Sequence, residues 1–229
     1  RHLIYDNAAA RIGKGTSFAC DRLAKFLRDL WREHGTQGFL LKYDVRHFFA
    51  SVDHEVLWGL LKPAFAWDER VQRLIHTYIV SYHDEPRRGL PLGNQTSSWF
   101  ALAYLDGLDR LVKERLRVHG YTRYMDDGVL VHHSRDYLRE CLGQQREYVA
   151  CERHLEFNDK TQIVPVSQGA DYLGWHFYLT DTGKVVRRQR TANKQRMKAR
   201  LKRIRRANAA GKLPPDKGMQ IVRSYLNHL

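Results

Sequence analysis

Two neighbouring acids, Asp126 and Asp127, lie in the segment YTRYMDDGVLV (121–131), with apolar residues on both sides. Like charges this close raise each other's proton affinity, so a buried pair of this kind needs a cation. A third acid, Asp44, lies between LLKY and Val45 in the strongest predicted strand of the chain. Two strands that each present a carboxylate can hold two Mg²⁺ ions about 3.5–4 Å apart for in-line phosphoryl transfer. The alternative is that Asp44 caps a turn and that Asp126 and Asp127 merely form a hairpin tip.

The surrounding sequence predicts the elements that position these acids. GFLLKYDV (38–45) predicts a buried strand, and YTRYMDDGVLV predicts a strand, a tight turn containing Asp126, Asp127 and Gly128, and a second strand. Helices that alternate with strands and hairpins favour an α+β layer fold. The other predicted elements are loops over 11–16 and 89–98, helices over 20–33, 53–61, 68–80 and 137–153, a long helix from about 99, short strands between 155 and 178, and a turn at 181–183. Asp53 is the expected N-cap of the helix over 53–61.

The positive charge of the chain is concentrated in its last part. Its 229 residues include 39 Lys and Arg against 25 Asp and Glu, and the net charge of +14 suggests nucleic acid or another polyanion as partner. From Lys184 to Leu229 there are 15 basic residues and one acid, Asp216. The first 183 residues therefore have no net charge, and the hydrophobic content of 43% predicts a packed globular protein.

Several classes of protein are not supported by the sequence. Three scattered cysteines, Cys20, Cys141 and Cys151, are too few for a disulfide framework or a Cys-rich zinc site. No apolar run approaches the roughly 20 residues of a membrane helix, and the first residues show no signal-peptide pattern. We therefore expect a cytoplasmic protein that does not contact a membrane.

Five ordered blocks of the sequence resemble the successive palm motifs of reverse transcriptases. A YxDD motif alone is a weak signal because a four-residue pattern recurs by chance, whereas five blocks in the right order between residues 40 and 175 are specific. The resemblance implies an RNA-directed DNA polymerase with a right-hand palm, in which an antiparallel sheet is flanked by helices. The blocks are LLKYDVRHFFASVDH (40–54), GLPLGNQTSS (89–98), YTRYMDDGVLV (121–131), LEFNDKTQI (155–163) and DYLGW (171–175).

The resemblance implies a catalytic centre built on the three acids. Asp44 and Asp126 correspond to metal ligands, with Asp127 as the neighbouring acid and the carbonyl of Val45 as a further metal contact. The implied cofactor is two Mg²⁺ ions, for which Mn²⁺ can substitute. Lys160 corresponds to a lysine thought to protonate the departing pyrophosphate, and a well-placed general acid contributes roughly 10²–10⁴-fold. A lone lysine in a polar turn is otherwise simply solvated.

An aromatic residue follows Asp44 where this family places a ring under the incoming sugar. Phe49 is five residues after Asp44 and would collide with a 2′-hydroxyl, which favours dNTPs over rNTPs. The alternative is that Phe48 and Phe49 are both core residues. The resemblance therefore implies DNA synthesis with Phe49 as the sugar gate.

The resemblance also implies contacts to the nucleotide from two loops. PLGN (91–94) corresponds to the segment behind the templating base, where Gly93 permits close backbone approach and Leu92 replaces the Gln of many reverse transcriptases. Asn94 or Thr96 would cap the next helix. RIGKGT (11–16) resembles the last fingers block. The implied nucleotide-binding residues are Phe49, Leu92, Gly93, Arg11 and Lys14, although the last two are also typical surface cations.

The end of the chain predicts contacts to the template and primer. Tyr172, Leu173 and Gly174 correspond to the turn that grips the primer end. Residues 187–206 contain 11 Lys or Arg and no acid, and they predict a basic helix. Such a helix can bind a membrane surface or simply be solvated, but after this turn it corresponds to the start of a thumb that contacts phosphates. The expected contacts are Arg196, Arg200 and Arg203, beside an apolar stripe of Met197, Leu201 and Ile204.

The pattern of PLGNQTSS, RIGKGT and RYMDD most resembles the diversity-generating retroelement reverse transcriptases. Those enzymes copy a template RNA with many errors at adenines and work with a small helical accessory protein. That subfamily usually ends the motif with Ser-Gln, whereas Ser98 follows Ser97 here, so phage-defence and group II intron-like enzymes remain alternatives. A catalytically inactive nucleic-acid-binding scaffold is the alternative from another class.

The resemblance divides the chain into three expected parts. Residues 1–38 correspond to the remaining part of the fingers, 39–183 to the palm with fingers-side helices over about 54–88, and 184–229 to the first part of the thumb. The earliest motifs of the family are missing, so we expect a fragment of a longer polymerase. Its partners would be template RNA, the cDNA or primer, dNTPs and, by the subfamily resemblance, an accessory protein.

Overall fold

The structure is a computed structural model that describes residues 3–83, 85–210 and 214–226. Outside the described residues lie residues 1–2 of the expected fingers and residues 211–213 and 227–229 of the expected thumb. The chain divides into two compact units. The first comprises residues 1–173 and 177–186, and the second comprises 174–176 and 187–229.

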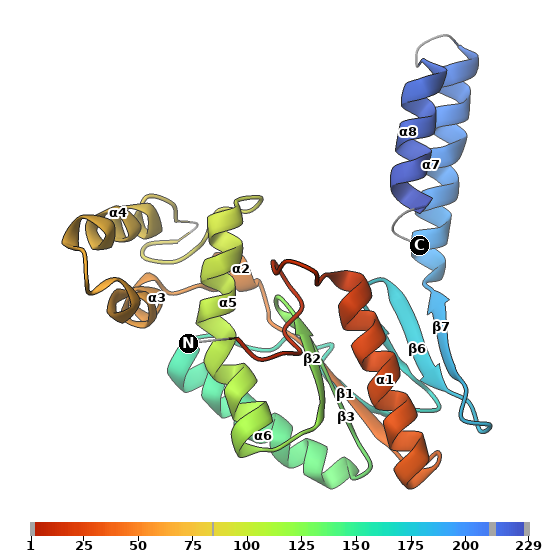
Figure 1. Ribbon diagram of the computed structural model, residues 1–229, viewed down its shortest axis with the longest axis horizontal. Helices are drawn as coiled ribbons and strands as arrows, with labels where there is room; N and C mark the ends of the chain where they lie inside the picture. The colour runs from red at the N-terminus through yellow and green to blue at the C-terminus, as the bar shows by residue number, and fades with distance from the viewer. Residues whose placement is uncertain (1–2, 84, 211–213, 227–229) are drawn as a thin grey trace. The chain divides into compact units, whose positions relative to one another are not determined.

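An antiparallel sheet with strand order β2-β3-β1-β4 lies at the centre of the first unit (Figure 1). No residue of the central strands β1 and β3 is exposed, because helices cover both faces of the sheet. Helix α1 packs on β2 and β3, and α6 packs on β1 and β3. The strands are β1 (Phe39–Asp44), β2 (Gly120–Tyr124), β3 (Asp127–His132) and β4 (Gln162–Pro165).

The two faces of this sheet pack against different helices. Leu41, Tyr43 and Leu130 belong to the main core cluster, together with residues of α5 and α6 such as Leu105 and Leu138. Since side chains alternate along a strand, the neighbours of these residues point to the other face, where α1 packs. The helices are α1 (Thr16–His34), α2 (Phe48–Ser51), α3 (His54–Leu61), α4 (Glu69–Val80), α5 (Gln95–Arg110) and α6 (Arg135–Arg153), with a 3₁₀ helix η1 (Lys62–Phe65) and a π-helix η2 (Leu111–Arg115).

Side-chain caps explain where several of these helices begin. The carboxylates of Asp53 and Asp68 accept hydrogen bonds from the first backbone N–H groups of α3 and α4, as the sequence predicted for Asp53. Asn94 caps α5 by accepting from the backbone N–H of Thr96, and Ser134 caps α6. The prediction that residues 89–98 form a loop is therefore wrong for its last part, since α5 begins at Gln95.

The N-terminal segment lies along the outer strand β2. Asn7 forms a parallel bridge with Arg123, whose backbone carbonyl accepts from the Ala8 N–H at 3.0 Å. The Arg123 N–H donates to the carbonyl of Asp6 at 3.2 Å, and the Thr122 hydroxyl donates to the same carbonyl. This segment therefore satisfies backbone groups at an edge of the sheet that would otherwise be open.

A second sheet has the strand order β5-β6-β7, and the division between the two units runs through its strands β6 and β7. Gly183 forms the turn before β7, with φ +79° and its N–H donating to Thr180. A Cβ at Gly183 would meet the ring of Trp31, so glycine lets α1 approach this turn. The strands are β5 (Ala170–Tyr172), β6 (Trp175–Leu179) and β7 (Val185–Gln189).

The second unit consists mainly of two packed helices, α7 (Thr191–Ala209) and α8 (Pro215–Leu226). The predicted basic helix from 187 starts too early, because β7 continues to Gln189 and α7 begins at Thr191. Met197, Leu201 and Ile204 are half-buried as the apolar stripe predicted. In the part of the chain that the structure describes, none of the helices is long and apolar enough to cross a membrane.

Candidate active site

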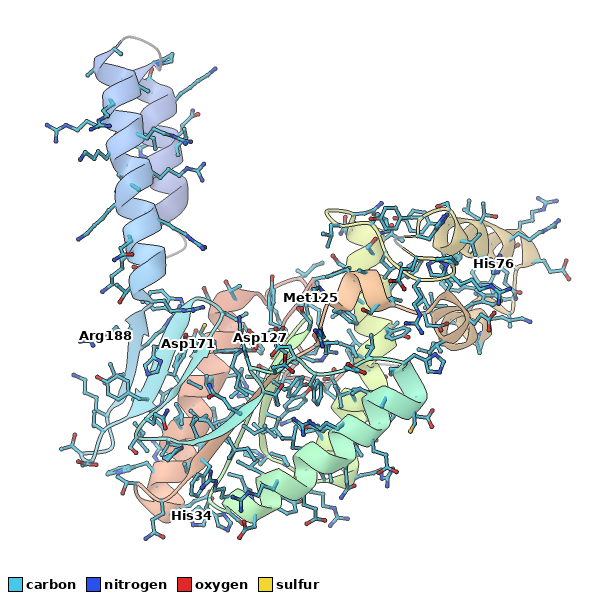
Figure 2. All side chains as sticks on the ribbon, turned by 180° about the vertical axis from the view of Figure 1, so that it is seen from behind. His34, His76, Met125, Asp127, Asp171 and Arg188 are labelled. Carbon is cyan, nitrogen blue, oxygen red and sulfur yellow. The ribbon has the colours of Figure 1, made fainter. Side chains whose placement is uncertain are left out.

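The three predicted acids meet at one end of the central sheet. Asp44 is the last residue of β1 and pairs in register with Asp127, the first residue of β3. Asp126 lies in the tight turn between β2 and β3, and its carbonyl accepts from the Val45 N–H at 3.2 Å. Figure 2 shows Met125 and Asp127 at this turn. Strand register therefore brings together acids that are more than 80 residues apart in the sequence.

The turn that carries Asp126 differs in detail from the predicted one. Met125, with φ +53°, adopts the left-handed conformation, whereas Asp127 and Gly128 already belong to β3. Gly128 is needed for space rather than for the turn, because a Cβ there would lie 2.2 Å from the Tyr43 ring on the facing strand. The tyrosine ring thus occupies the volume that a side chain on Gly128 would fill.

Burial and repulsion from neighbouring acids disfavour charge on Asp126 and Asp127. The pKa of Asp127 is raised to about 7, mainly by burial and also by Asp44 and Asp126, against the lowering effect of Lys42. The pKa of Asp126 is also raised, first by burial and then by the charge of Asp44. A bound cation would stabilise the charged form of both carboxylates.

Two residues that the sequence did not single out hold these carboxylates. The ammonium group of Lys42 lies 3.2 Å from a carboxylate oxygen of Asp127, and the two side chains share one face of the sheet because Lys42 is two residues before Asp44. The side-chain amide of Asn158 donates to the carboxylate of Asp44, and the Asn158 N–H donates to the Asp44 carbonyl at 2.8 Å. Asn158 lies in the NDK block, where only Lys160 was predicted.

The acids fit a divalent cation whose coordination is completed by water and substrate. Among the described residues, no three His, Cys, Asp or Glu side chains form a preformed metal-binding cluster. Mg²⁺ in polymerase sites is typically bound by one or two carboxylates, with waters and substrate phosphates as the other ligands. Asp44 and Asp126 provide hard oxygen donors of this kind, and the raised pKa of Asp126 fits such an ion.

The predicted nucleotide-binding residues differ in exposure. Phe48 is buried in the core, whereas Phe49 is half-buried with its ring 5.3 Å from that of Phe48. The Phe49 carbonyl accepts from the Leu90 N–H at 2.7 Å, which joins the segment after β1 to the loop before α5. Leu92 is 76% exposed, so it is not a core leucine. Gly93 has φ +79° and open space around its Cα.

Arg11 and Lys14 bind within their own segment of the chain. The guanidinium group of Arg11 donates to the carbonyls of Ile4, at 2.6 Å, and Asn7. The Lys14 ammonium lies 4.0 Å from the centre of the Tyr5 ring and also bonds the Tyr5 carbonyl. These contacts stabilise the loop of residues 4–14, and both cations remain partly accessible.

The other predicted residues are placed as follows. Tyr172 is buried in β5, and burial followed by the charge of Asp127 raises its pKa well above the usual range. Leu173 (φ +47°) and Gly174 (φ +87°) form the turn after it. Lys160 is exposed, and among the described residues no carboxylate pairs with its ammonium group. The exposed residues Arg196, Arg200 and Arg203 lie on α7 of the second unit.

The raised pKa of Asp127 predicts that the metal-free protein loses stability as pH rises. An ordinary aspartate titrates near 3.8, so between about pH 4 and pH 7 the folded state binds more protons than the unfolded state. Thermal unfolding followed by circular dichroism should therefore show a melting temperature that falls over this window. Asp127→Asn should flatten this dependence, and equal slopes in the two proteins would contradict the assignment.

These features define the palm of a right-hand polymerase. The profile of the family "Reverse transcriptase (RNA-dependent DNA polymerase)" matches residues 6–177, and the chain belongs to this family. Members of the family generally use divalent metal ions. A comparison with curated proteins finds no match.

The chain is similar in fold to solved telomerase structures. One is telomerase from Candida tropicalis truncated from its C-terminal domain, with TM-score 0.59, 14% identity, and coverage of 80% of this chain and 41% of that one. Another is telomerase from Candida albicans in complex with a fragment of telomeric RNA, with TM-score 0.63, 14% identity, and coverage of 80% and 36%. The chain thus spans about two fifths of these relatives or less.

Proposed function

We propose that this chain is the palm, part of the fingers and the start of the thumb of an RNA-directed DNA polymerase that makes cDNA on an RNA template. The observation that carries the proposal is the convergence of Asp44, Asp126 and Asp127 at one sheet end, where burial makes the charges of Asp126 and Asp127 unfavourable without a cation. A scaffold that only binds nucleic acid gains nothing from such acids. Membership of the reverse transcriptase family supports the same reaction.

Each residue of the centre has a distinct role in this proposal. Asp44 and Asp126, with the carbonyl of Val45, would hold two Mg²⁺ ions, which Mn²⁺ could replace. When bound, the ions would supply positive charge that activates the primer 3′-hydroxyl and neutralises the leaving pyrophosphate. Lys42 orients Asp127 through their 3.2 Å contact, and Asn158 orients Asp44. Lys160 would protonate the pyrophosphate only after its exposed side chain turns toward bound substrate.

The assignment of parts follows the same proposal. Residues 1–38 belong to the fingers, 39–183 to the palm and 184–229 to the thumb. The primer end lies at the turn of Tyr172, Leu173 and Gly174. The exposed arginines of α7 bind phosphates of the template and primer without reading their sequence.

Primer extension tests the proposal directly. The protein should extend a DNA primer on an RNA template when dNTPs and Mg²⁺ are supplied, and EDTA should abolish the product. Product that persists with EDTA would contradict the metal mechanism. A protein that binds the primer–template but makes no product with either Mg²⁺ or Mn²⁺ would favour the scaffold.

Replacing Phe49 with valine should relax the selection of deoxynucleotides. The half-buried ring packs edge-on against the buried Phe48, and the Phe49 carbonyl is bonded to the loop before α5, so a smaller side chain here should leave room for a 2′-hydroxyl. We expect the ratio of kcat/KM for dNTP over rNTP to fall about 10–100-fold, the range for loss of a few carbon atoms from a pocket. The matched control is Phe65→Val in η1. An equal fall of this ratio in the control would contradict the role of Phe49 as the sugar gate.

We further propose that the enzyme is an error-prone polymerase of a bacterial diversity-generating retroelement, acting in the cytoplasm with a small helical accessory protein. The exposed Leu92, at the position of a polar Gln in many reverse transcriptases, supports this reading because it leaves selection more dependent on shape. Sequencing the cDNA from the extension assay should show errors concentrated opposite template adenines. An even error spectrum would instead favour the phage-defence or group II intron-like classes.

A further inference from the structure

A fully buried arginine lies directly beneath the turn that carries Asp126. Arg123 of β2 has no exposed surface, and alternation along the strand directs it away from the face that holds Asp44 and Asp127. Its guanidinium group forms a two-pronged ion pair with the equally buried Asp109 of α5. Both N–H···O distances, from Nε to Oδ1 and from Nη2 to Oδ2, are 2.7 Å.

Asp109 is in turn held by other buried groups. It accepts from the side-chain amide of Asn7 at 3.0 Å and from the hydroxyl of Tyr121 at 2.7 Å. The Tyr121 hydroxyl also lies 2.7 Å from that of Tyr43 on β1. A buried polar network with this many internal bonds is rigid, because moving one member leaves others without partners.

The third arm of the guanidinium group reaches the catalytic turn. Nη1 of Arg123 donates to the carbonyl of Met125, the residue immediately before Asp126. Met125 is in the left-handed region, with φ +53°, which is unfavourable for a residue with a side chain and persists only where surrounding contacts fix it. On the other side of Asp126, its own carbonyl is tied to the Val45 N–H. The turn is thus held from β2 and from β1.

Stability alone does not explain why the Arg123–Asp109 ion pair is buried beneath this turn. Replacing a buried ion pair by apolar residues of similar volume is often neutral or stabilising, so such a pair is weak evidence for a role in stability. An apolar pair, however, has no donor for the Met125 carbonyl. Among buried side chains only a planar fork of donors can hold a carboxylate with two N–H groups and a carbonyl with a third.

We propose that Arg123, fixed by Asp109, is a positioning residue that holds the Met125–Asp126 turn in place, so that the Asp126 carboxylate is in position before metal and nucleotide bind. The catalytic consequence rests on the proposed polymerase function. The effect on the turn does not, and it can be measured without activity.

Arg123→Lys is the informative variant. A lysine keeps a positive charge beside Asp109, but its single ammonium group cannot span both the carboxylate and the Met125 carbonyl. The matched control is Arg153→Lys in α6, since Arg153 is also buried and also bonds backbone carbonyls, those of Tyr104 and Glu152, away from the turn. Both variants are to be compared with the parent by NMR-detected amide hydrogen exchange, without metal or nucleic acid.

The amide of Val45 reports the position of the turn, because its N–H donates to Asp126. The amide of Val166, which donates to Gly38 at the other end of the sheet, reports the sheet as a whole. We expect Val45 to exchange at least about tenfold faster in Arg123→Lys than in Arg153→Lys, with Val166 unchanged. Unchanged exchange at Val45, or equal acceleration at both amides, would overturn the proposal.

Primer extension separates this inference from the function on which it rests. In an active parent, Arg123→Lys should lower kcat about 10–100-fold with little change in the KM for dNTP, because a misplaced ligand weakens chemistry more than nucleotide binding. Arg153→Lys should not lower kcat selectively in this way. A wild-type kcat in Arg123→Lys would contradict the proposal that Arg123 supports catalysis by positioning Asp126. If the parent makes no product, the proposed function fails, while exchange at Val45 still decides whether Arg123 positions the turn.

Discussion

Replacing Asp126 with alanine should lower primer extension by at least about 10³-fold, which corresponds to about 4 kcal/mol of transition-state stabilisation. Asp126 lies in the turn beside Asp44, and its ionisation is disfavoured by burial and by that neighbour, so its charge is useful only with a cation. Single-turnover extension of a labelled DNA primer on RNA, with saturating dNTPs, measures the loss.

The same variant should fold normally. Removing a buried acid relieves repulsion with Asp44, so the metal-free melting temperature at pH 8 should equal or exceed that of the parent. Asp181→Ala, at an exposed turn residue, is the control and should extend primers at the parental rate. Equal product from parent and Asp126→Ala would refute the metal mechanism.

Replacing Asp109 with alanine should destabilise the protein by about 3–5 kcal/mol, because it leaves the fully buried guanidinium group of Arg123 without its counter-ion. Burial lowers the pKa of Arg123, and the variant lacks the charge of Asp109 that raises it in the parent. An arginine side chain nevertheless stays protonated in proteins, so the variant must bury an unpaired positive charge. Urea unfolding followed by circular dichroism measures the change, provided that the slope m stays constant.

An exposed ion pair provides the comparison for Asp109→Ala. The Asp136 and Arg139 side chains on α6 are 86% and 57% exposed, and such pairs contribute about 0.2–1 kcal/mol. Asp136→Ala should therefore cost under about 1 kcal/mol. A similar loss in the two variants would mean that water reaches Arg123 and that its burial is not maintained in solution.

The sequence was sufficient to predict the parts of the fold that depend on local patterns. The apolar run before Asp44 and the hairpin around Asp126 predicted β1, β2 and β3, and Asp53 was correctly predicted as a cap. The ordered blocks also identified the family, which the match over residues 6–177 confirms. The roles of the individual site residues stay predictions.

What the sequence could not predict depends on contacts between distant residues. Asn158 and Lys42 are ordinary polar residues in their own segments, and only strand pairing brings them to Asp44 and Asp127. Arg123 looked like one polar residue of an alternating strand, because its partner Asp109 lies on a helix 14 residues earlier. The boundary between β7 and α7 was missed because Arg and Lys are compatible with either element.

The segment of residues 6–8 along β2 also has a consequence for handling the protein. Its bonds with Thr122 and Arg123 cover backbone groups that would otherwise be free to recruit a strand from another molecule. A shortened version that begins after residue 9 would expose this edge and remove Asn7 from Asp109. Expression designs should therefore keep these residues, since without them we expect self-association through β2 and loss of material to aggregates.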